Sequence, residues 1–191
     1  MEDQHERGAI LFVVALVVLA ALIGAAAFFT WQNRQASVEE PQPQEPTVTN
    51  FEECGQYYAV MESYPRRCAT PDGRTFTEDI GNELEKQDVI TITSPRPNQI
   101  VGSPLAITGS ARGMWFFEAS FPVRLLDENG DELASGIATA EGDWMTEDFV
   151  PFTAELEFLL SGNGKGTLIL ERDNPSGLPE NDDSLIVPVE F

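Results

Sequence analysis

The C-terminal half of this sequence is predicted to fold as an all-β sandwich. From residue 88 onward, short runs rich in β-branched and aromatic residues are separated by Gly, Pro, Asn and Asp at roughly regular spacing. Within the longer runs, apolar and polar residues alternate, as in a strand that buries one face. The chain has 191 residues, enough for one domain of usual size with extensions. A second large domain is therefore not expected.

Seven candidate strands follow one another in this region, which is the basic count of an immunoglobulin-like sandwich. They cover residues 89–94, 104–109, 115–126, 132–139, 149–158, 166–172 and 184–190. Asn129-Gly130 lies between the third and fourth strands and is a two-residue hairpin signal, because both residues tolerate positive φ. These two strands are expected to pair.

The alternation also assigns side chains to the core. In the third strand, the side chains that are expected to point inward are those of Phe117, Ala119, Phe121, Val123 and Leu125. In the fifth and last strands, the corresponding positions are Phe152, Ala154, Leu156, Phe158, Leu185, Val187 and Val189. The intervening residues are mostly polar and are expected to face solvent.

An uncharged apolar block covers residues 8–31, GAILFVVALVVLAALIGAAAFFTW. At about 1.5 Å per residue, a helix of this length crosses a hydrocarbon core about 30 Å thick. Phe28, Phe29 and Trp31 lie where an interfacial aromatic anchor is expected. The block therefore predicts a single transmembrane helix that holds the chain in the cell membrane.

The orientation of this helix is inferred from the cysteines. Arg7 precedes the block and Arg34 follows it, so the flanking charges favour neither direction. Both cysteines lie beyond the block, and a disulfide requires an oxidising compartment. Residues 1–7 are thus predicted to be a cytoplasmic head, and the C-terminal domain is predicted to be extracytoplasmic.

A cleaved signal peptide is the alternative to a retained anchor. Ala25-Ala26-Ala27 matches an A-x-A cleavage site. The acidic head, however, carries Glu2, Asp3 and Glu6 where a signal peptide usually carries positive charge. The retained anchor is the preferred prediction.

Two short regions connect the apolar block to the sandwich. Residues 32–50 are rich in Pro, Gln and Glu and are predicted to be an extended linker. Residues 51–87 contain Cys54 and Cys68, and a disulfide there would close a loop of about 15 residues and stabilise it by roughly 3 kcal/mol. A free thiol pair is the alternative. We expect this disulfide-stapled segment to be a cap or stalk packed beside the domain at 88–191.

The charge of the chain excludes one class of partner. The formal net charge is −21, with 32 acidic residues against 11 basic ones. Nucleic-acid binding requires clustered Lys and Arg, which are scattered here, and an anionic lipid surface would repel such a chain. The acidity is expected to keep the domain soluble and monomeric. Recruitment of cations or of a basic partner is the other interpretation.

The loop at residues 172–184, RDNPSGLPENDDS, is the preferred candidate for a functional surface, because binding residues concentrate on loops held by a rigid scaffold. Its candidate residues are Asp173, Asn174, Glu180, Asp182 and Asp183. A solvated acidic loop is the simpler interpretation. Gathering of these oxygens around calcium is the alternative, and otherwise no cofactor or metal is expected.

Trp115 and Trp144 complete the set of candidate binding residues. Each lies at a strand edge close to a glycine, Gly113 or Gly142. Core packing is the preferred interpretation, and an exposed aromatic platform for carbohydrate or peptide is the alternative.

Catalytic groups are scarce beyond the apolar block. That part of the sequence has no His, since His5 precedes the block, and it has no Gly-x-Ser-x-Gly motif. Its two cysteines are assigned to the disulfide rather than to a nucleophile. We therefore expect a protein that is not an enzyme.

The sandwich region resembles a known family over residues 89–191. The matching stretches are ITSPRPNQIVGSPLAITGSARG at 92–113, WFFEASFPVRLLDENG at 115–130, GDWMTEDFVPF at 142–152 and RDNPSGLPENDDSLIVPV at 172–189. They are similar to the immunoglobulin-like domain of bacterial spore germination. The resemblance implies an exported, non-enzymatic immunoglobulin-like module. It does not imply sporulation, because the chain has no room for the germination or amidase domains that accompany some members.

These inferences together predict a membrane-anchored, extracytoplasmic binding or scaffold module of the bacterial cell envelope. Its expected partners are the membrane, through the N-terminal helix, and an envelope protein or peptidoglycan. The alternative is a calcium-dependent structural or sensor module that uses the loop at 172–184.

Overall fold

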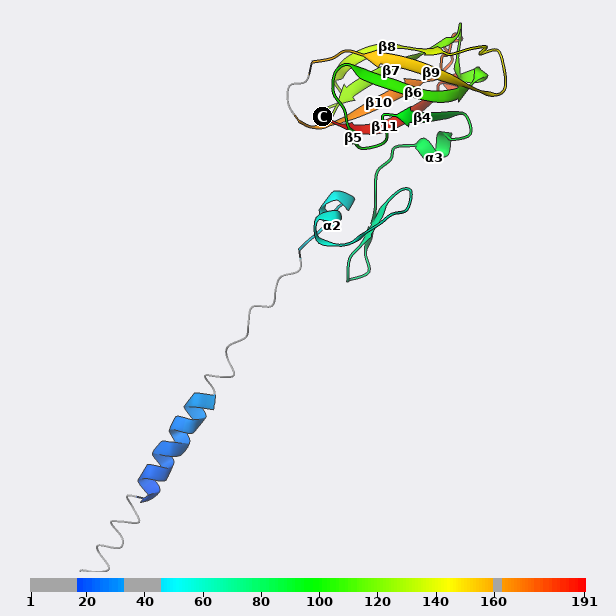
Figure 1. Cartoon of the computed structure of the whole chain (residues 1–191). Helices are drawn as coiled ribbons and strands as arrows, with labels where there is room; N and C mark the ends of the chain where they lie inside the picture. Colours follow the sequence, from blue (N-terminus) through cyan, green and yellow to red (C-terminus); the bar gives the residue numbers. More distant parts are fainter. Residues whose placement is uncertain (1–16, 33–45, 160–162) are drawn as a thin grey trace, which may run out of the picture. The chain divides into compact units, whose positions relative to one another are not determined.

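The computed structural model describes residues 17–32, 46–159 and 163–191, and it divides into one unit that ends at Thr47 and one at Val48–Phe191 (Figure 1). In the first unit, residues 17–32 form a helix within the predicted membrane block. No helix among the described residues combines the length and apolar composition that a membrane crossing requires. The predicted head at 1–7, the first part of the predicted span and most of the predicted linker lie outside the described residues.

The second unit contains eight strands joined into one curled sheet, with the order β4-β6-β9-β8-β7-β10-β11-β5. These strands are β4 (Ile90–Ser94), β5 (Gln99–Ile100), β6 (Leu105–Arg112), β7 (Ser120–Asp127), β8 (Glu132–Ala140), β9 (Phe149–Leu156), β10 (Lys165–Glu171) and β11 (Ser184–Glu190). Neighbouring strands are antiparallel except β11 and β5, which are parallel. Seven of the strands correspond to the seven predicted ones.

The sheet folds over at β8 and so becomes a two-layered sandwich. Along most of its length β8 pairs with β7, and only its C-terminal end, at Thr139 and Ala140, pairs with β9. The layer β4-β6-β9 therefore faces the layer β7-β10-β11. The ring of Phe121 on β7 packs edge-on against the ring of Phe152 on β9, with 4.9 Å between centroids. The predicted sandwich is confirmed.

The predicted inward positions of β7, β9 and β11 form much of the core. The buried side chains among them are Phe121, Val123, Leu125, Phe152, Leu156, Phe158, Leu185, Val187 and Val189. Their alternation along three strands places one apolar face of each layer against the other, which removes the apolar surface from water.

The prediction that the third strand begins at residue 115 is wrong. β7 begins at Ser120, and Gly113–Trp115 form a short 3-10 helix, η1. Glu118 and Ala119 have positive φ values of 49° and 64°, and they lie in a tight turn in which Phe117 and Ser120 exchange two backbone hydrogen bonds. The turn reverses the chain, so Phe117 is 41% exposed rather than buried.

The hairpin between β7 and β8 pairs these strands as predicted, but its loop is longer than two residues. The Asp127 carboxylate accepts hydrogen bonds from the backbone N–H groups of Asn129 and Asp131, at 2.8 and 2.9 Å. Only Gly130 in this loop has positive φ. The hydrogen bond from the Asp131 N–H is the main cause of the lowered pKa of Asp127.

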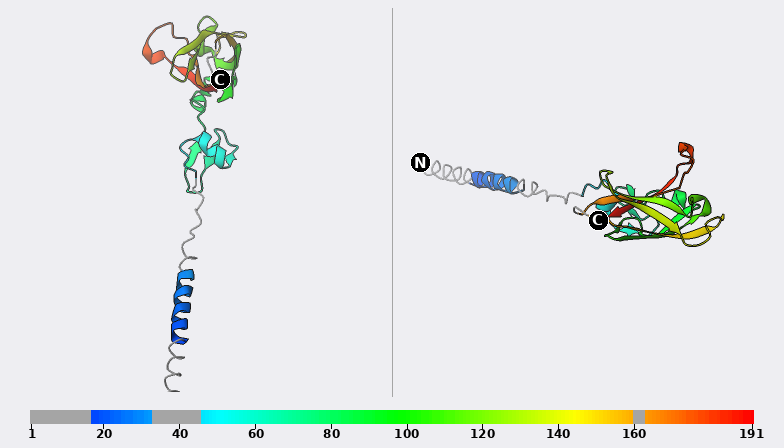
Figure 2. Two further views of the ribbon diagram at one scale, coloured as in Figure 1. Left: turned by 90° about the vertical axis from the view of Figure 1, so that its left-hand side faces the viewer. Right: turned by 90° about the horizontal axis from the view of Figure 1, so that it is seen from above.

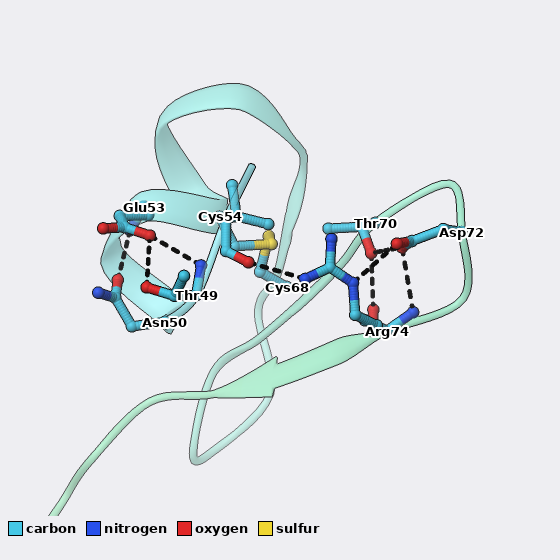
Figure 3. The surroundings of a disulfide bond; sticks show 9 residues. Thr49, Asn50, Glu53, Cys54, Cys68, Thr70, Asp72 and Arg74 are labelled. Atoms are coloured by element: carbon cyan, nitrogen blue, oxygen red, sulfur yellow. Dashed lines mark hydrogen bonds and ion pairs between the residues drawn. A yellow bond between two sulfur atoms is a disulfide. The ribbon is translucent and has the colours of Figure 1, made fainter. Parts of the chain in front are cut away.

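The stapled segment precedes the sandwich and has its own small elements. They are α2 (Phe51–Tyr57), β1 (Val60–Met61), β2 (Arg67–Ala69), β3 (Thr75–Thr77) and α3 (Glu83–Lys86). The first three strands form an antiparallel sheet, and the predicted disulfide joins Cys54 on α2 to Cys68 on β2 (Figure 3). The cross-link supplies the stability that so small a core lacks.

This second unit begins before the predicted linker boundary at residue 50. Val48 is fully buried beside the two half-cystines, and its carbonyl accepts a hydrogen bond from Arg74 Nη1 at 2.8 Å. Asn50 is the N-cap of α2, since its Oδ1 accepts from the Glu53 N–H at 2.8 Å (Figure 3). The end of the predicted linker therefore belongs to the folded segment.

Candidate functional site

The loop at residues 172–183 projects from the end of the sandwich where β10 ends and β11 begins (Figure 2). It contains a short 3-10 helix, η2 (Pro179–Asn181). Asn174 organises it, because its Nδ2 donates to the Leu178 carbonyl at 2.8 Å and to Asp182 Oδ1 at 2.7 Å. The loop thus holds a defined shape through its own hydrogen bonds.

A polar cleft of about 650 Å³ lies at the base of this loop, against α3. Four of the five predicted loop residues line it, namely Asp173, Asn174, Asp182 and Asp183, whereas Glu180 lies outside on η2. The residues that sequence reasoning missed include Asn82 and Lys86. They lie about 100 positions away in the chain, and no local pattern connects them with the loop.

The cleft contains charges of both signs. Lys86 Nζ lies 2.5 Å from Asp183 Oδ1, and Arg172 donates from Nε to the Met114 carbonyl at 3.2 Å. In the part of the chain that the structure describes, no three His, Cys, Asp or Glu side chains are grouped as a metal site requires. Asp182 and Asp183 instead have partners within the protein. In the acidic loop, Asp182 accepts a hydrogen bond from Asn174 Nδ2, and Asp183 pairs with Lys86.

The two predicted tryptophans have structural positions. Trp115 is 1% exposed and lies in the core, so its interpretation as a surface binding residue is wrong: the η1 turn directs its ring between the layers. Its indole Nε1 has no hydrogen-bond partner among the described residues. Trp144 is half-buried and packs against the same core. Core packing, the preferred interpretation, accounts for both rings.

Trp115 nevertheless connects the loops at this end of the sandwich. Its carbonyl accepts a hydrogen bond from the Asp173 N–H at 3.1 Å. On the other side of η1, a Cβ atom added to Gly113 would lie 2.0 Å from the Thr146 carbonyl oxygen and 2.2 Å from that of Trp144. Residues 141–148 therefore cross the backbone of Gly113 in a contact that only glycine allows.

Three loops consequently meet around η1, and we refer to residues 113–119, 141–148 and 172–183 as the loop end. Further contacts hold the second of these loops. Arg112 Nη1 donates to the Glu147 carbonyl at 2.8 Å, and its guanidinium lies 4.7 Å from the centroid of the Phe149 ring. The strand topology places all three loops at one end of the sandwich, opposite the β7–β8 hairpin (Figure 1).

A second polar cluster joins the stapled segment to the sandwich. Glu78 is buried and receives two hydrogen bonds from Arg66, at 2.9 Å from Nε and 2.6 Å from Nη2. The Nδ2 of Asn98, from the loop before β5, also donates to Glu78, at 3.3 Å. The contact with Arg66 is the main cause of the lowered pKa of the Glu78 carboxyl.

Glu83 is the second buried carboxylate of this polar cluster. It accepts from Arg96 Nη1 at 2.6 Å and from the Tyr64 hydroxyl, which in turn accepts from Arg96 Nη2. Burial and the hydrogen bond to Glu83 raise the pKa of Tyr64 to about 12. Arg96 and Asn98 of the sandwich bind carboxylates of the preceding segment, so this cluster attaches the two parts.

The comparison with known families bears on the sandwich alone. Residues 89–177 match the model of the immunoglobulin-like domain of bacterial spore germination. The match confirms the resemblance that the sequence indicated. It begins at β4, includes η1 and the loop at 141–148, and ends within the projecting loop. Searches among curated proteins and among solved structures find no match to the chain.

The match agrees with the observed architecture. In this immunoglobulin-like domain, β11 lies beyond the matched residues but completes the core through Leu185, Val187 and Val189. Immunoglobulin-like domains present their loops at the ends of a rigid sandwich. The family thus suggests a binding or scaffold module rather than a catalyst.

Proposed function

We propose that this protein is a membrane-anchored, non-catalytic binding or scaffold module of the bacterial cell envelope, with its immunoglobulin-like domain outside the cytoplasm. The observation that carries the proposal is the loop end, where three loops of a rigid sandwich converge beside a polar cleft of about 650 Å³. Such an arrangement displays side chains to a partner while the core keeps their positions constant.

Two further features support the location. The uncharged block at residues 8–31 has the length and composition of a membrane anchor. The disulfide between Cys54 and Cys68 is a bond that persists in oxidising compartments. On this proposal the domain acts as a monomer without a cofactor, and its partner is an envelope protein or peptidoglycan.

The test of binding uses the full chain, purified in a nonionic detergent and immobilised, with peptidoglycan and solubilised membrane proteins offered separately. The loop variant replaces residues 175–180 by a Gly-Ser sequence of the same length. Its matched control replaces Glu128 and Asn129 at the opposite end of the sandwich. We expect one fraction to be retained by the native chain and the control, and to be lost with the loop variant.

The same experiment distinguishes the alternatives. Retention of neither fraction would contradict the proposed function. Retention that requires millimolar calcium and is abolished by a chelator would replace the cofactor-free proposal with a calcium-dependent one. Retention by the loop variant at the native level would move the binding surface away from the loop end.

The anchor is tested separately. We expect the chain to remain in the membrane pellet after extraction at alkaline pH, and protease added outside intact spheroplasts to remove the domain. Release into the supernatant would contradict the anchor, and full protection from protease would contradict the orientation.

A further inference from the structure

The loop end exposes apolar side chains from all three of its loops. Met114 is 56% exposed, Phe117 41%, Met145 77% and Leu178 50%. Exposed apolar residues are normal when scattered singly, but a group of them on contacting loops marks an interaction surface. Methionine is suited to such a surface because its flexible, polarisable side chain adapts to different partners.

These side chains stand on a rigid base. The buried ring of Trp115 fixes the backbone of η1 to the core. The contact of Gly113 with Thr146 and the hydrogen bond of Trp115 with Asp173 fix it to the two neighbouring loops. Met114 therefore projects from a turn whose neighbours on both sides are held. The backbone of such a surface loses little conformational entropy when a partner binds.

The same loops are strongly acidic. They carry nine carboxylate side chains against one cationic side chain, that of Arg172. Among the described residues, the ion pair that neutralises one of these carboxylates joins Asp183 to Lys86. The remaining carboxylates lie on the same three loops as the exposed apolar residues, so the loop end has a negative potential.

We propose that the loop end binds a segment of a partner protein that presents basic and apolar side chains together. Apolar side chains of that segment would cover Met114 and Met145, while its Lys and Arg side chains would pair with the carboxylates of the same loops. An anionic polymer would be repelled by the same surface. This inference rests on the proposed binding function and names the chemical class of the partner.

The probe is a fluorescent 16-residue peptide of Lys and Leu with Leu on one helical face. One control peptide has Glu in place of every Lys, and the other has Ser in place of every Leu. Binding to the full chain in nonionic detergent is measured by anisotropy, with the signal of empty micelles subtracted. We expect the Lys-Leu peptide to bind and both controls to bind at least about tenfold more weakly.

Two paired variants locate the site. Met114→Ser with Met145→Ser should weaken binding roughly tenfold, since it removes the apolar contact. Asp143→Asn with Glu147→Gln should weaken binding severalfold and reduce its dependence on salt. The matched control, Glu155→Gln with Glu157→Gln, makes the same charge change on exposed positions of and just after β9, and should leave binding unchanged.

Each outcome decides the inference. Equal losses in the loop-end and control charge variants would show a diffuse effect of net charge and would overturn it. Equal binding of the Lys-Leu and Glu-Leu peptides, or no binding of either, would also overturn it. If an envelope fraction is still retained by the native chain and lost with the loop variant, the proposed function stands and only the partner class is refuted.

Discussion

Ala119 has a backbone conformation that favours glycine. Its φ of 64° follows a φ of 49° at Glu118, and both lie in the left-handed region. The turn is maintained by the hydrogen bonds between Phe117 and Ser120 and by the Ala140 N–H, which donates to the Ala119 carbonyl at 2.9 Å. Tertiary contacts therefore hold a conformation that the side chain opposes.

Ala119→Gly should consequently stabilise the protein. Removing the Cβ relieves the left-handed strain, which we expect to raise the free energy of unfolding by about 1 kcal/mol. Urea denaturation followed by tryptophan fluorescence measures this change. The matched control is Ala106→Gly at an exposed position of β6, which should cost about 0.5 to 1 kcal/mol. Equal destabilisation by both substitutions would contradict the prediction.

The same turn shows why residue-level prediction was incomplete. Phe117, Ala119 and Phe121 continue the alternation of a strand, so the pattern alone assigned all three to the core. Only Phe121 is buried, because the hydrogen bonds of the turn reverse the chain between Phe117 and Ser120. Alternation reports which side chains prefer burial but not where the chain bends.

The stapled segment depends on its disulfide. Its small apolar cluster around Cys54 and Cys68 is separate from the core of the sandwich. Replacing both cysteines by serine removes the cross-link across a separation of 14 residues and should destabilise this segment by about 3 kcal/mol.

Hydrogen exchange tests this prediction element by element. Amides of β1 to β3 should exchange much faster in the double serine variant, while those of β6 and β9 should keep their protection. The native chain treated with a reductant serves as the control and should behave like the variant. Equal loss of protection in both parts would show that the segment and the sandwich unfold as one unit.

The ion pair between Arg66 and Glu78 is expected to contribute more to the stability of the protein than a surface ion pair does. It neutralises Glu78, whose side chain is 7% exposed, so Arg66→Met leaves a buried carboxylate without its main partner and should cost about 2 kcal/mol. Arg124→Met is the matched control, because the carboxylates that it pairs with, Glu132 and Glu171, are 42% and 35% exposed. The control should cost less than about 1 kcal/mol. Similar costs in chemical denaturation would contradict this difference.

The lowered pKa of Glu78 fixes the direction in which the stability contributed by the Arg66–Glu78 pair changes with pH. Arg66 lowers the pKa of Glu78, so the stabilisation is present above the usual carboxyl pKa of 4.5 and is lost as pH falls through the lower folded value. In Arg66→Met the loss of stability on acidification should be smaller, because the ionised form of Glu78 is no longer stabilised by the guanidinium. An unchanged acid profile of the melting temperature would rule out this contribution.

The whole chain carries a net charge of −21, and this charge should make its stability depend on salt. Screening shortens the range of repulsion between carboxylates, so raising NaCl from about 20 to 500 mM should increase the melting temperature by several degrees. Glu155→Lys with Glu157→Lys reduces the net charge and should reduce the increase. A melting temperature independent of salt would mean that the acidic surface causes no significant repulsion.

Several properties of this protein follow from its sequence alone. Periodicity identified seven strands and most of the core, and the positions of Cys54 and Cys68 predicted the disulfide. These are local signals, since alternation and cysteine spacing are read within one short segment. The resemblance that identified the immunoglobulin-like domain likewise resides in contiguous stretches, and the family match confirms it over residues 89–177.

Only the tertiary structure decided how distant segments meet. Asp173 contacts Trp115 across 58 positions, and Asn82 donates to the Ser184 carbonyl across 102. The sequence did not predict the arginine partners of buried Glu78 and Glu83 either, because the arginines are scattered along so acidic a chain. Such contacts are set by the folding of the sheet at β8 and by the packing of α3, neither of which is encoded in a repeating pattern. The loop end is therefore a product of the fold as a whole.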